Sequence, residues 1–310
     1  MDYYIGNTDY GWFNFLKNQN DPQQPEDINF WKPGGQRTFE SIKKGEPFLF
    51  RLKRPYYKIA GVAFFSRFVK LPLDYAWDVF ELQNGVGSYY SFRNKIEIYR
   101  LRNRIRNDER IGCIVLSNPI FFDEDNWIES PEDWNNSIVQ GKRYSCEDRI
   151  GKKTWDKVLD AIKLTNNTDI LNIDDNNTPA YNYGIQKIRI GQSAFRLNVA
   201  EAYSNKCAIS GETALPTLQA AHIKPYSEQG SNNLNTNGIL LRSDLHRLYD
   251  KGYIAISEDY KIKVSKRLGE EFNSEYYNRY DGKELSMPSS INDYPSKEFL
   301  IWHNEHYFQE

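Results

Sequence analysis

Residues 207–252 read CAISGETALPTLQAAHIKPYSEQGSNNLNTNGILLRSDLHRLYDKG, and this stretch decides the fold of the C-terminal part of the chain. The segment LQAAHI predicts a short strand that ends near His222, because a proline follows shortly after it. Behind a polar loop and Asn237, GILLR predicts a second strand. Ser243 suits the N-cap of a helix over DLHRLYD, and Gly252 suits its C-terminal stop. The predicted order is therefore strand, loop, strand and helix.

This order can bring two histidines to one groove. His222 lies on the first strand and His246 on the helix, whereas the other two of the four histidines, His303 and His306, lie near the C-terminus. A neutral histidine can take the proton from an attacking water molecule, and a bound divalent ion can stabilise charge on a phosphate. The pair therefore suits phosphodiester hydrolysis, with His222 as the base and His246 as a metal ligand.

Less specific interpretations of the same residues stay open. A single histidine on a strand is most often a structural residue, and Asn237-Gly238 is also an ordinary turn dipeptide. Arg242 and Arg247 are candidates for phosphate contacts, although solvated surface arginines are equally common.

Three motifs, AHIKP, NGILLR and SDLHRLYDKG, together resemble the core of HNH (ββα-metal) endonucleases of the bacterial restriction type. The resemblance implies a strand histidine that acts as general base, an asparagine that orients the loop and the base, and a helix histidine that binds metal. These roles fall to His222, Asn237 and His246. The resemblance also implies a divalent ion, Mg²⁺, Mn²⁺ or Ni²⁺, and double-stranded DNA as the partner.

The sequence departs from the family pattern at one metal-ligand position. Many members carry an Asp or His directly before the base, and here that position is Ala221. Asp250 lies four residues after His246, on the same face of the predicted helix, and Asp244 lies near the helix start. We expect one of these carboxylates to complete the metal site, with Asp250 slightly ahead of Asp244.

The chain has 310 residues, which is long for one compact domain and comfortable for two. Asn, Asp and Thr are frequent in residues 164–184, the best linker candidate, and an amphipathic helix with Phe195, Val199 and Tyr203 on one side follows. The predicted organisation is a first domain over residues 1–150, a linker with a helix over residues 151–185, and a nuclease domain over residues 186–310.

Composition excludes some classes of function and partner. A net charge of −2 supplies no global field for a polyanion, so nucleic-acid contacts must depend on local basic patches. The three cysteines are far apart, and Ser210 stands where a Cys-x-x-Cys pair would need its second thiol, so no structural zinc is expected. The chain lacks a membrane-length apolar run and a secretory pattern, which predicts a cytoplasmic protein without membrane contact.

The first half predicts a mixed α+β domain with an antiparallel, barrel-like core. Residues 48–68 alternate as two strands around a Pro-Tyr-Tyr turn, and residues 111–116 and 138–144 suggest further strands. Between them, residues 71–85 (LPLDYAWDVFELQNG) show helical spacing and end at Asn84-Gly85.

Within residues 27–145, the segments NFWKPGG, GEPFLFRLKRPYYKIAGVAFF, LPLDYAWDVF and DWNNSIVQGKRY resemble the PUA-like domain of modification-dependent restriction nucleases. PUA-like relatives include the EVE and SRA types. The resemblance implies a β-barrel that binds DNA and takes a flipped, often modified base into an aromatic pocket. Extraction of a base costs free energy that stacking and edge contacts must offset.

Several side chains near these motifs suit such contacts, although core packing is the commoner use of each aromatic. Trp31 is the first candidate for stacking because its context, FWKPGG, is polar and glycine-rich. The run RLRNRIR at residues 100–106 more readily predicts a solvated helix face. The remaining candidates are Tyr56, Tyr57, Phe65 and Trp77 for stacking, and Arg51, Lys53, Arg54 and Lys58 for phosphate.

The sequence as a whole predicts a metal-dependent DNA endonuclease that restricts DNA carrying modified cytosine, in defence of a bacterium against phage. Two alternatives remain. One is an HNH nuclease that acts on unmodified DNA or RNA, and the other is a catalytically silent nucleic-acid-binding protein, which Ala221 makes conceivable. A homodimer is also left open.

Overall fold

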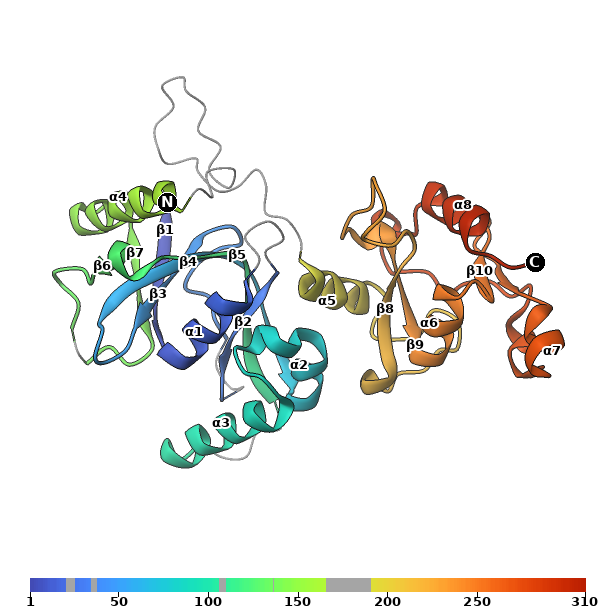
Figure 1. Cartoon of the computed structure of the whole chain (residues 1–310), viewed down its shortest axis with the longest axis horizontal. Helices are drawn as coiled ribbons and strands as arrows, with labels where there is room; N and C mark the ends of the chain where they lie inside the picture. Colours follow the sequence, from blue (N-terminus) through green and yellow to red (C-terminus); the bar gives the residue numbers. More distant parts are fainter. Residues whose placement is uncertain (21–25, 35–37, 106–109, 136, 166–190) are drawn as a thin grey trace, which may run out of the picture. The chain divides into compact units, whose positions relative to one another are not determined.

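The computed structural model of the protein describes residues 1–20, 26–34, 38–105, 110–135, 137–165 and 191–310. They form two compact units, Met1–Ser193 and Ala194–Glu310 (Figure 1). The division lies later than the expected boundary at residue 150, because helix α4 (Arg149–Leu164), expected in the linker, packs into the core of the first unit. Most of the predicted linker falls on residues 166–190, outside the described residues.

A seven-stranded sheet forms the centre of the first unit. Its strand order is β2-β5-β4-β3-β1-β7, and β6 pairs with β4. The strands are β1 (Asp2–Thr8), β2 (Ile28–Lys32), β3 (Pro47–Leu52), β4 (Lys58–Pro72), β5 (Arg110–Phe121), β6 (Ile128–Glu129) and β7 (Gly141–Ser145); the other helices are α1 (Tyr10–Gln19), α2 (Leu73–Phe80), η1 (Glu81–Asn84), α3 (Tyr89–Arg102) and η2 (Glu124–Asn126).

The predicted α+β class is confirmed, but the expected antiparallel, barrel-like core is not a closed barrel. Strands β1 and β3 pair in parallel, because the chain passes through α1 and β2 before it returns in the same direction. Among the described residues, the sheet path ends at β2 and β7, and no ladder joins these two strands. The sheet is therefore mixed and open over the described part of the chain.

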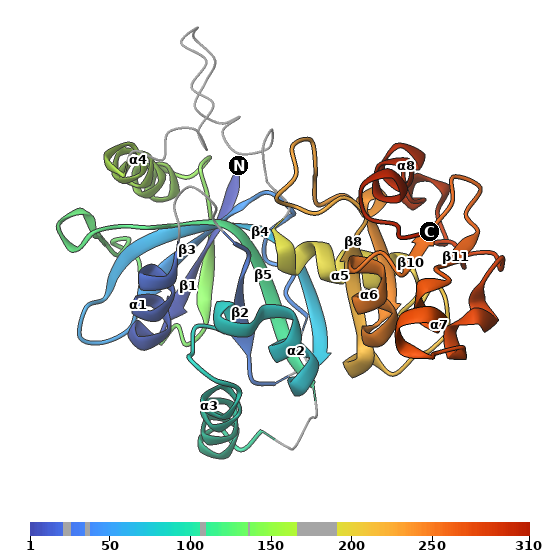
Figure 2. The ribbon, with the colours of Figure 1, turned by 45° about the vertical axis from the view of Figure 1, so that its right-hand side comes forward.

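Both faces of the sheet are covered, which explains why its strands are apolar on both sides. Along β3, Phe48 and Phe50 join a core with α1, whereas Leu49 points to a second core that contains Trp155 and Val158 of α4. Figure 2 shows α1 and α4 with the strands of the sheet between them. Successive residues of one strand thus belong to two different cores.

The two helices predicted in the first half are confirmed. Helix α2 continues into η1 and ends at Gly85, whose φ of 74° suits glycine. The arginine run begins inside α3, as expected, but Arg100 is buried and donates to the backbone carbonyls of Pro33 and Arg110. This arginine therefore anchors the helix and is not part of a solvated face.

The second unit has a ββα arrangement at its centre, in the predicted order. Strands β8 (Leu218–His222) and β9 (Gly238–Arg242) pair antiparallel, and α6 (Ser243–Asp250) follows directly. The other elements are α5 (Gln192–Ala202), which begins just before the unit boundary, η4 (Leu215–Thr217), η5 (Asn235–Asn237), β10 (Ile254–Ile256), β11 (Ile262–Val264), α7 (Arg267–Phe272), η6 (Tyr276–Tyr280), η7 (Ile291–Asp293) and α8 (Lys297–His306).

The ends of α6 differ slightly from the sequence expectation. Arg242 occupies the N-cap position and Ser243 is the first helical residue, so the cap lies one residue earlier than predicted. Gly252 lies just beyond the C-terminus with a φ of 74°, as predicted, and its Cα packs against the backbone carbonyl of Tyr307. None of the described helices is both long and apolar enough to cross a membrane.

Candidate active site

The ββα unit brings His222 and His246 to one site. His222 is the last residue of β8, and its backbone pairs with Gly238, the first residue of β9. Helix α6 packs against both strands and carries His246. The two imidazoles and the carboxyl group of Asp250 interact electrostatically, since His246 and Asp250 both shift the pKa of His222.

One nitrogen of His222 is fixed and the other is left with a lone pair. Its Nε2 lies 2.8 Å from the amide oxygen of Asn233, which can only accept, so Nε2 carries the hydrogen. Nδ1 is then the unprotonated nitrogen of the neutral ring. The ring stacks on Phe195 with centroids 3.9 Å apart. Burial lowers the pKa of His222 below its usual value of 6.5, which keeps the ring neutral and able to accept a proton.

His246 is held in the opposite tautomer. Its Nδ1 lies 2.9 Å from the amide oxygen of Gln219, so Nδ1 donates and Nε2 has the free lone pair. Burial lowers the pKa of His246, although the charge of Asp250 acts in the other direction. Partial removal from water raises the pKa of Asp250, while attraction to His246 and His222 lowers it. A neutral imidazole with a fixed second nitrogen is the usual state of a metal-binding histidine.

His246 and Asp250 fit two neighbouring ligands of one divalent ion. Their Nε2 and Oδ2 atoms are 3.3 Å apart, on the same face of α6. Two ligands that are each about 2.1 Å from a metal, at right angles, are separated by about 3.0 Å. Among the described residues no group of three His, Cys, Asp or Glu side chains converges on one point, so further ligands would be water and substrate oxygens.

Asn237 is fully buried and holds the loop that follows His222. Its Oδ1 accepts from the backbone N–H of Lys224 at 2.9 Å. Its Nδ2 donates to the carbonyl oxygens of Lys224 and Asn232, at 3.0 and 2.9 Å, and lies 3.1 Å from the hydroxyl of Ser231. The dipeptide is not a positive-φ turn, because Gly238 is extended with a φ of −130°. The side chain therefore orients the loop that also carries Asn233.

Helix α5 contributes the ring that stacks on His222. Gly238 allows this close approach, since a Cβ at that position would lie 2.4 Å from Val199 and 3.0 Å from Phe195. The same helix carries Arg196, whose charge lowers the pKa of both His222 and His246. Arg196 is thus a cation near both imidazoles, and it suits a contact with a substrate phosphate.

The structure joins two of the predicted site residues to each other. Arg242 makes two hydrogen bonds to Asp244, at 2.6 and 2.7 Å, and Tyr277 donates to the same carboxylate at 3.1 Å. The pair locks the start of α6, and its internal partners make Asp244 a poorer metal ligand than Asp250. Arg247 is exposed on α6 and forms no ion pair with a described residue, so it keeps the charge that a phosphate contact needs.

Some of the sequence candidates of the first unit line two adjoining pockets. Trp31 lines a pocket of about 720 Å³ together with Tyr4, Trp12 and Phe30, and its indole N–H donates to the carbonyl of Asn84 at 3.0 Å. Lys53 lines this pocket and a smaller one of about 160 Å³ that contains Arg51 and Tyr57. Tyr56 instead packs against Tyr10 and Trp127, Phe65 is buried in the core, and Trp77 packs against Tyr89 and Phe92.

Some residues around these sites have no strong sequence signal. Asn233 and Gln219 fix the two imidazoles from positions 11 and 27 residues away, and such single amides in a polar segment look like any others. Arg196 could have been noticed as the basic residue next to Phe195 on the amphipathic helix. In the first unit, Asn7 and Trp134 complete the smaller pocket from distant parts of the sequence.

Comparisons with solved structures return weak likenesses. ASCH from Zymomonas mobilis matches with a TM-score of 0.34 and 10% identity, over 51% of this chain and 94% of that one. A modification-dependent TagI restriction endonuclease matches with a TM-score of 0.32 and 12% identity, over 91% of this chain and 75% of that one. No curated protein sequence matches the chain.

The comparison with protein families is more specific. Residues 207–257 match the family model of the HNH endonuclease. The matched segment contains β8, β9 and α6, and with them His222, Asn237 and His246. The second unit of the chain therefore carries an HNH endonuclease domain, the catalytic module of a nuclease.

Proposed function

We propose that the protein is a metal-dependent endonuclease that hydrolyses phosphodiester bonds of double-stranded DNA. The observation that carries this proposal is the arrangement of the two imidazoles. Each has one nitrogen fixed by an amide oxygen and a lone pair on the other nitrogen. Such a pair suits one proton acceptor and one metal ligand in a shared site.

In this proposal His222 is the general base. Its Nδ1 accepts the proton of the water molecule that attacks phosphorus, while Nε2 keeps its hydrogen bond to Asn233. Stacking on Phe195 holds the plane of the ring, and the contacts of Asn237 hold the loop from which Asn233 reaches it. Arg196 and Arg247 supply positive charge toward the phosphate, where negative charge grows in the transition state.

His246 and Asp250 are the residues that would hold the divalent ion. The bound ion would stabilise charge on the scissile phosphate and on the leaving oxygen. The tautomer of His246 suits this role, because the hydrogen bond of Nδ1 to Gln219 directs the Nε2 lone pair toward Asp250. Asp250 takes the place of the metal ligand that Ala221 does not provide.

We propose further that the first unit selects DNA with modified cytosine. The sequence resemblance to the PUA-like domain of modification-dependent nucleases supports this, and so does the aromatic pocket of about 720 Å³. Trp31 and Phe30 line that pocket, and so do the cationic side chains of Lys32 and Arg102, so the lining combines aromatic rings with positive charge. A flipped base with an added group could be held there by stacking and edge contacts. Such selectivity suits restriction of foreign DNA.

One digestion experiment tests both parts of this proposal. Matched duplexes and plasmids that contain unmodified, methylated, hydroxymethylated or glucosylated cytosine are incubated with Mg²⁺, Mn²⁺, Ni²⁺ or EDTA. We expect metal-dependent nicked or linear products, mainly from one modified substrate. His222→Ala should lower the rate by about 100- to 10,000-fold without loss of DNA binding in EDTA. Equal cleavage of all substrates would reject the modification preference, and cleavage by the His222→Ala variant at the unaltered rate would reject the mechanism.

A further inference from the structure

The smaller pocket of the first unit is built around a buried arginine. Strands β1 and β3 pair so that Asn7 lies beside Arg51, one position from the end of each strand. By strand alternation both side chains lie on the face that carries Ile5 and Leu49. Arg51 is only 4% exposed. A cationic group is therefore placed at the end of two core strands, where a hydrocarbon side chain would be expected.

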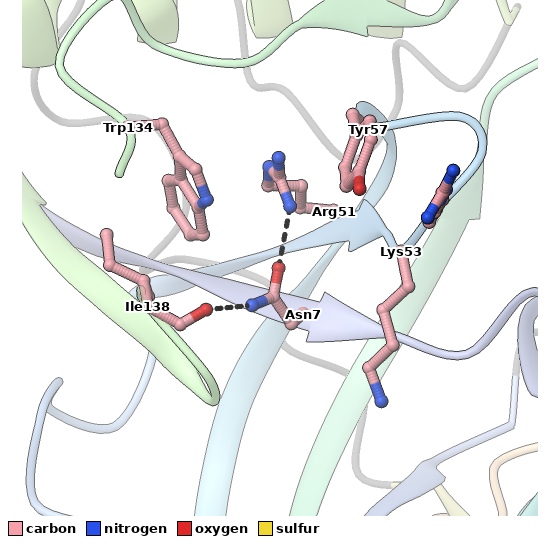
Figure 3. A pocket seen from close by; sticks show the side chains of 7 residues that line it. Asn7, Arg51, Lys53, Tyr57, Trp134 and Ile138 are labelled. Atoms are coloured by element: carbon pink, nitrogen blue, oxygen red, sulfur yellow. Dashed lines mark hydrogen bonds between the residues drawn. The ribbon is translucent and has the colours of Figure 1, made fainter. Parts of the chain in front are cut away.

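The guanidinium of Arg51 is held firmly by its neighbours. Its Cζ lies 4.5 Å from the ring centre of Trp134 and 5.2 Å from that of Tyr57, and Figure 3 shows it between these rings. Nε donates to the hydroxyl of Ser130 at 2.7 Å, and Nη1 donates to the amide oxygen of Asn7 at 2.8 Å. The hydroxyl of Ser130 in turn donates to the carbonyl of Tyr57. These contacts are all neutral, so they orient the cation without neutralising it.

No carboxylate compensates this charge among the described residues. Arg51 forms no ion pair with them, and no Asp or Glu lines the pocket of about 160 Å³. Two more cations, Lys53 and Arg54, line the same pocket. Loss of water lowers the pKa of Arg51, as expected for a buried charge without an acidic partner. Because an unpaired buried charge is costly, a site of this kind is better explained by an anion that arrives with a ligand.

We propose that this pocket binds a phosphate group, and that in the DNA complex this is a backbone phosphate. Arginine suits the flat, multidentate recognition of phosphate oxygens, and lysine adds a point charge. The small volume fits such a group and not a whole nucleotide. The larger aromatic pocket shares Asn7 and Lys53 with this one. A base in the larger pocket would therefore lie next to a phosphate in the smaller pocket. Only the source of the phosphate rests on the proposed function.

Binding measurements on the full chain in EDTA test this proposal without any dependence on cleavage. The affinity for a fluorescent duplex is measured by anisotropy over a series of salt concentrations. Lys53→Gln and Arg54→Gln remove charges at the mouth of the pocket. Lys58→Gln is the matched control, because Lys58 belongs to the same basic segment but pairs with Glu129 at 3.1 Å and does not line the pocket. Arg51→Gln removes the central cation.

We expect Lys53→Gln and Arg54→Gln each to weaken duplex binding by about 3- to 10-fold and to reduce the salt slope by about one. Arg51→Gln should weaken binding more, and Lys58→Gln should bind like the unaltered protein. Calorimetry with 5′-deoxycytidine monophosphate and with deoxycytidine identifies the source of the phosphate. If the variants lose affinity for the nucleotide but not for the duplex, the pocket binds the phosphate of a free nucleotide and not that of the DNA backbone.

Two results would overturn the proposal. The first is that Lys53→Gln and Arg54→Gln have the same duplex and nucleotide affinities as Lys58→Gln. This result would count against the proposal even if Arg51→Gln did not fold. The second is that deoxycytidine binds as tightly as its monophosphate while duplex affinity is unchanged in the variants. A loss of duplex affinity with no preference for modified cytosine would instead reject the substrate proposal and retain the phosphate pocket.

Discussion

At the scale of single residues, the proposed roles of the two histidines depend on two amide side chains. Asn233 fixes the hydrogen on Nε2 of His222, and Gln219 fixes the hydrogen on Nδ1 of His246. The same kind of contact thus selects opposite tautomers at two places. Without these contacts each imidazole would divide its population between two tautomers, and only one of them would serve its role.

The pH dependence of cleavage tests the role of His222. Burial lowers the pKa of this imidazole, so the base stays unprotonated as the pH falls below 6.5 and activity is lost only at lower pH. Asn233→Asp replaces the neutral acceptor by a carboxylate, which stabilises the imidazolium and should move the acidic limb of the rate profile to higher pH. Rates at saturating metal measure this, with Asn232→Asp as a control. An unchanged limb would show that His222 is not the titrating base.

Asp250 and Asp244 can be separated by metal binding. Asp250→Asn should weaken Mn²⁺ binding by about 10- to 100-fold, because a neutral amide is a poorer ligand than a carboxylate. Asp244→Asn should leave the affinity unchanged and lower the melting temperature, since it breaks the contact with Arg242. Calorimetric titration of each full-length variant with Mn²⁺ distinguishes the role of Asp250 from that of Asp244. Equal affinity of Asp250→Asn and the unaltered protein would remove Asp250 from the site.

At the scale of elements, the site depends on how closely α5 approaches β9. Gly238→Ala would place a Cβ 2.4 Å from Cγ2 of Val199, which forces the helix and its Phe195 ring away from His222. We expect a loss of about 1 to 3 kcal/mol in the free energy of unfolding and a lower cleavage rate. Val199→Ala in the same chain should restore part of both, because it removes the clashing methyl group.

The measurements for this pair are denaturant unfolding and initial cleavage rates of both single variants and the double variant. Strict additivity of their effects would contradict a steric cause, since two residues in contact should be coupled. Val199→Ala alone serves as the control for the cavity that the smaller side chain leaves.

The elements that the sequence predicts well are those set by local patterns. The order of β8, β9 and α6 follows from alternation, a proline and a terminal glycine within one short stretch. Strand β1 carries no such pattern, because both its faces are covered and its partners, β3 and β7, lie far along the chain. Helix α4 is locally recognisable, but its place in the first core depends on a sheet face that local sequence does not reveal.

The site residues divide in the same way. His222, Asn237 and His246 belong to motifs whose spacing is recognisable, and the structure places them in one ββα unit. The sequence does not predict the contact of Arg242 with Asp244, because two neighbouring opposite charges at a helix start also suit separate contacts with phosphate and metal. The pocket around Arg51 joins three separate segments of the chain, so its lining cannot be predicted without the fold of the sheet.

At the scale of the whole molecule, the chain divides into two compact units, and the second contains one buried histidine outside the proposed active site. His303 on α8 is 2% exposed, stacks on Tyr249 of α6 at 3.9 Å, and its Nε2 lies 3.2 Å from the carbonyl oxygen of that residue. It thereby connects helix α8 to the C-terminal end of helix α6. Burial lowers the pKa of His303 to about 4.

This histidine should make the stability of the second unit sensitive to acid. Its pKa is about 4 in the folded chain and near 6.5 when unfolded, so protonation favours unfolding. The stabilising contribution is complete above pH 6.5 and is lost progressively down to about pH 4, a difference of roughly 3 kcal/mol. His303→Phe keeps the stacked ring and removes the titration, so the stability gap between the two proteins should narrow as the pH falls. Thermal unfolding at a series of pH values measures this gap, and His306→Phe, at an exposed histidine of the same helix, is the control. A gap that stays constant from pH 7 to pH 4 would mean that His303 does not titrate in this range.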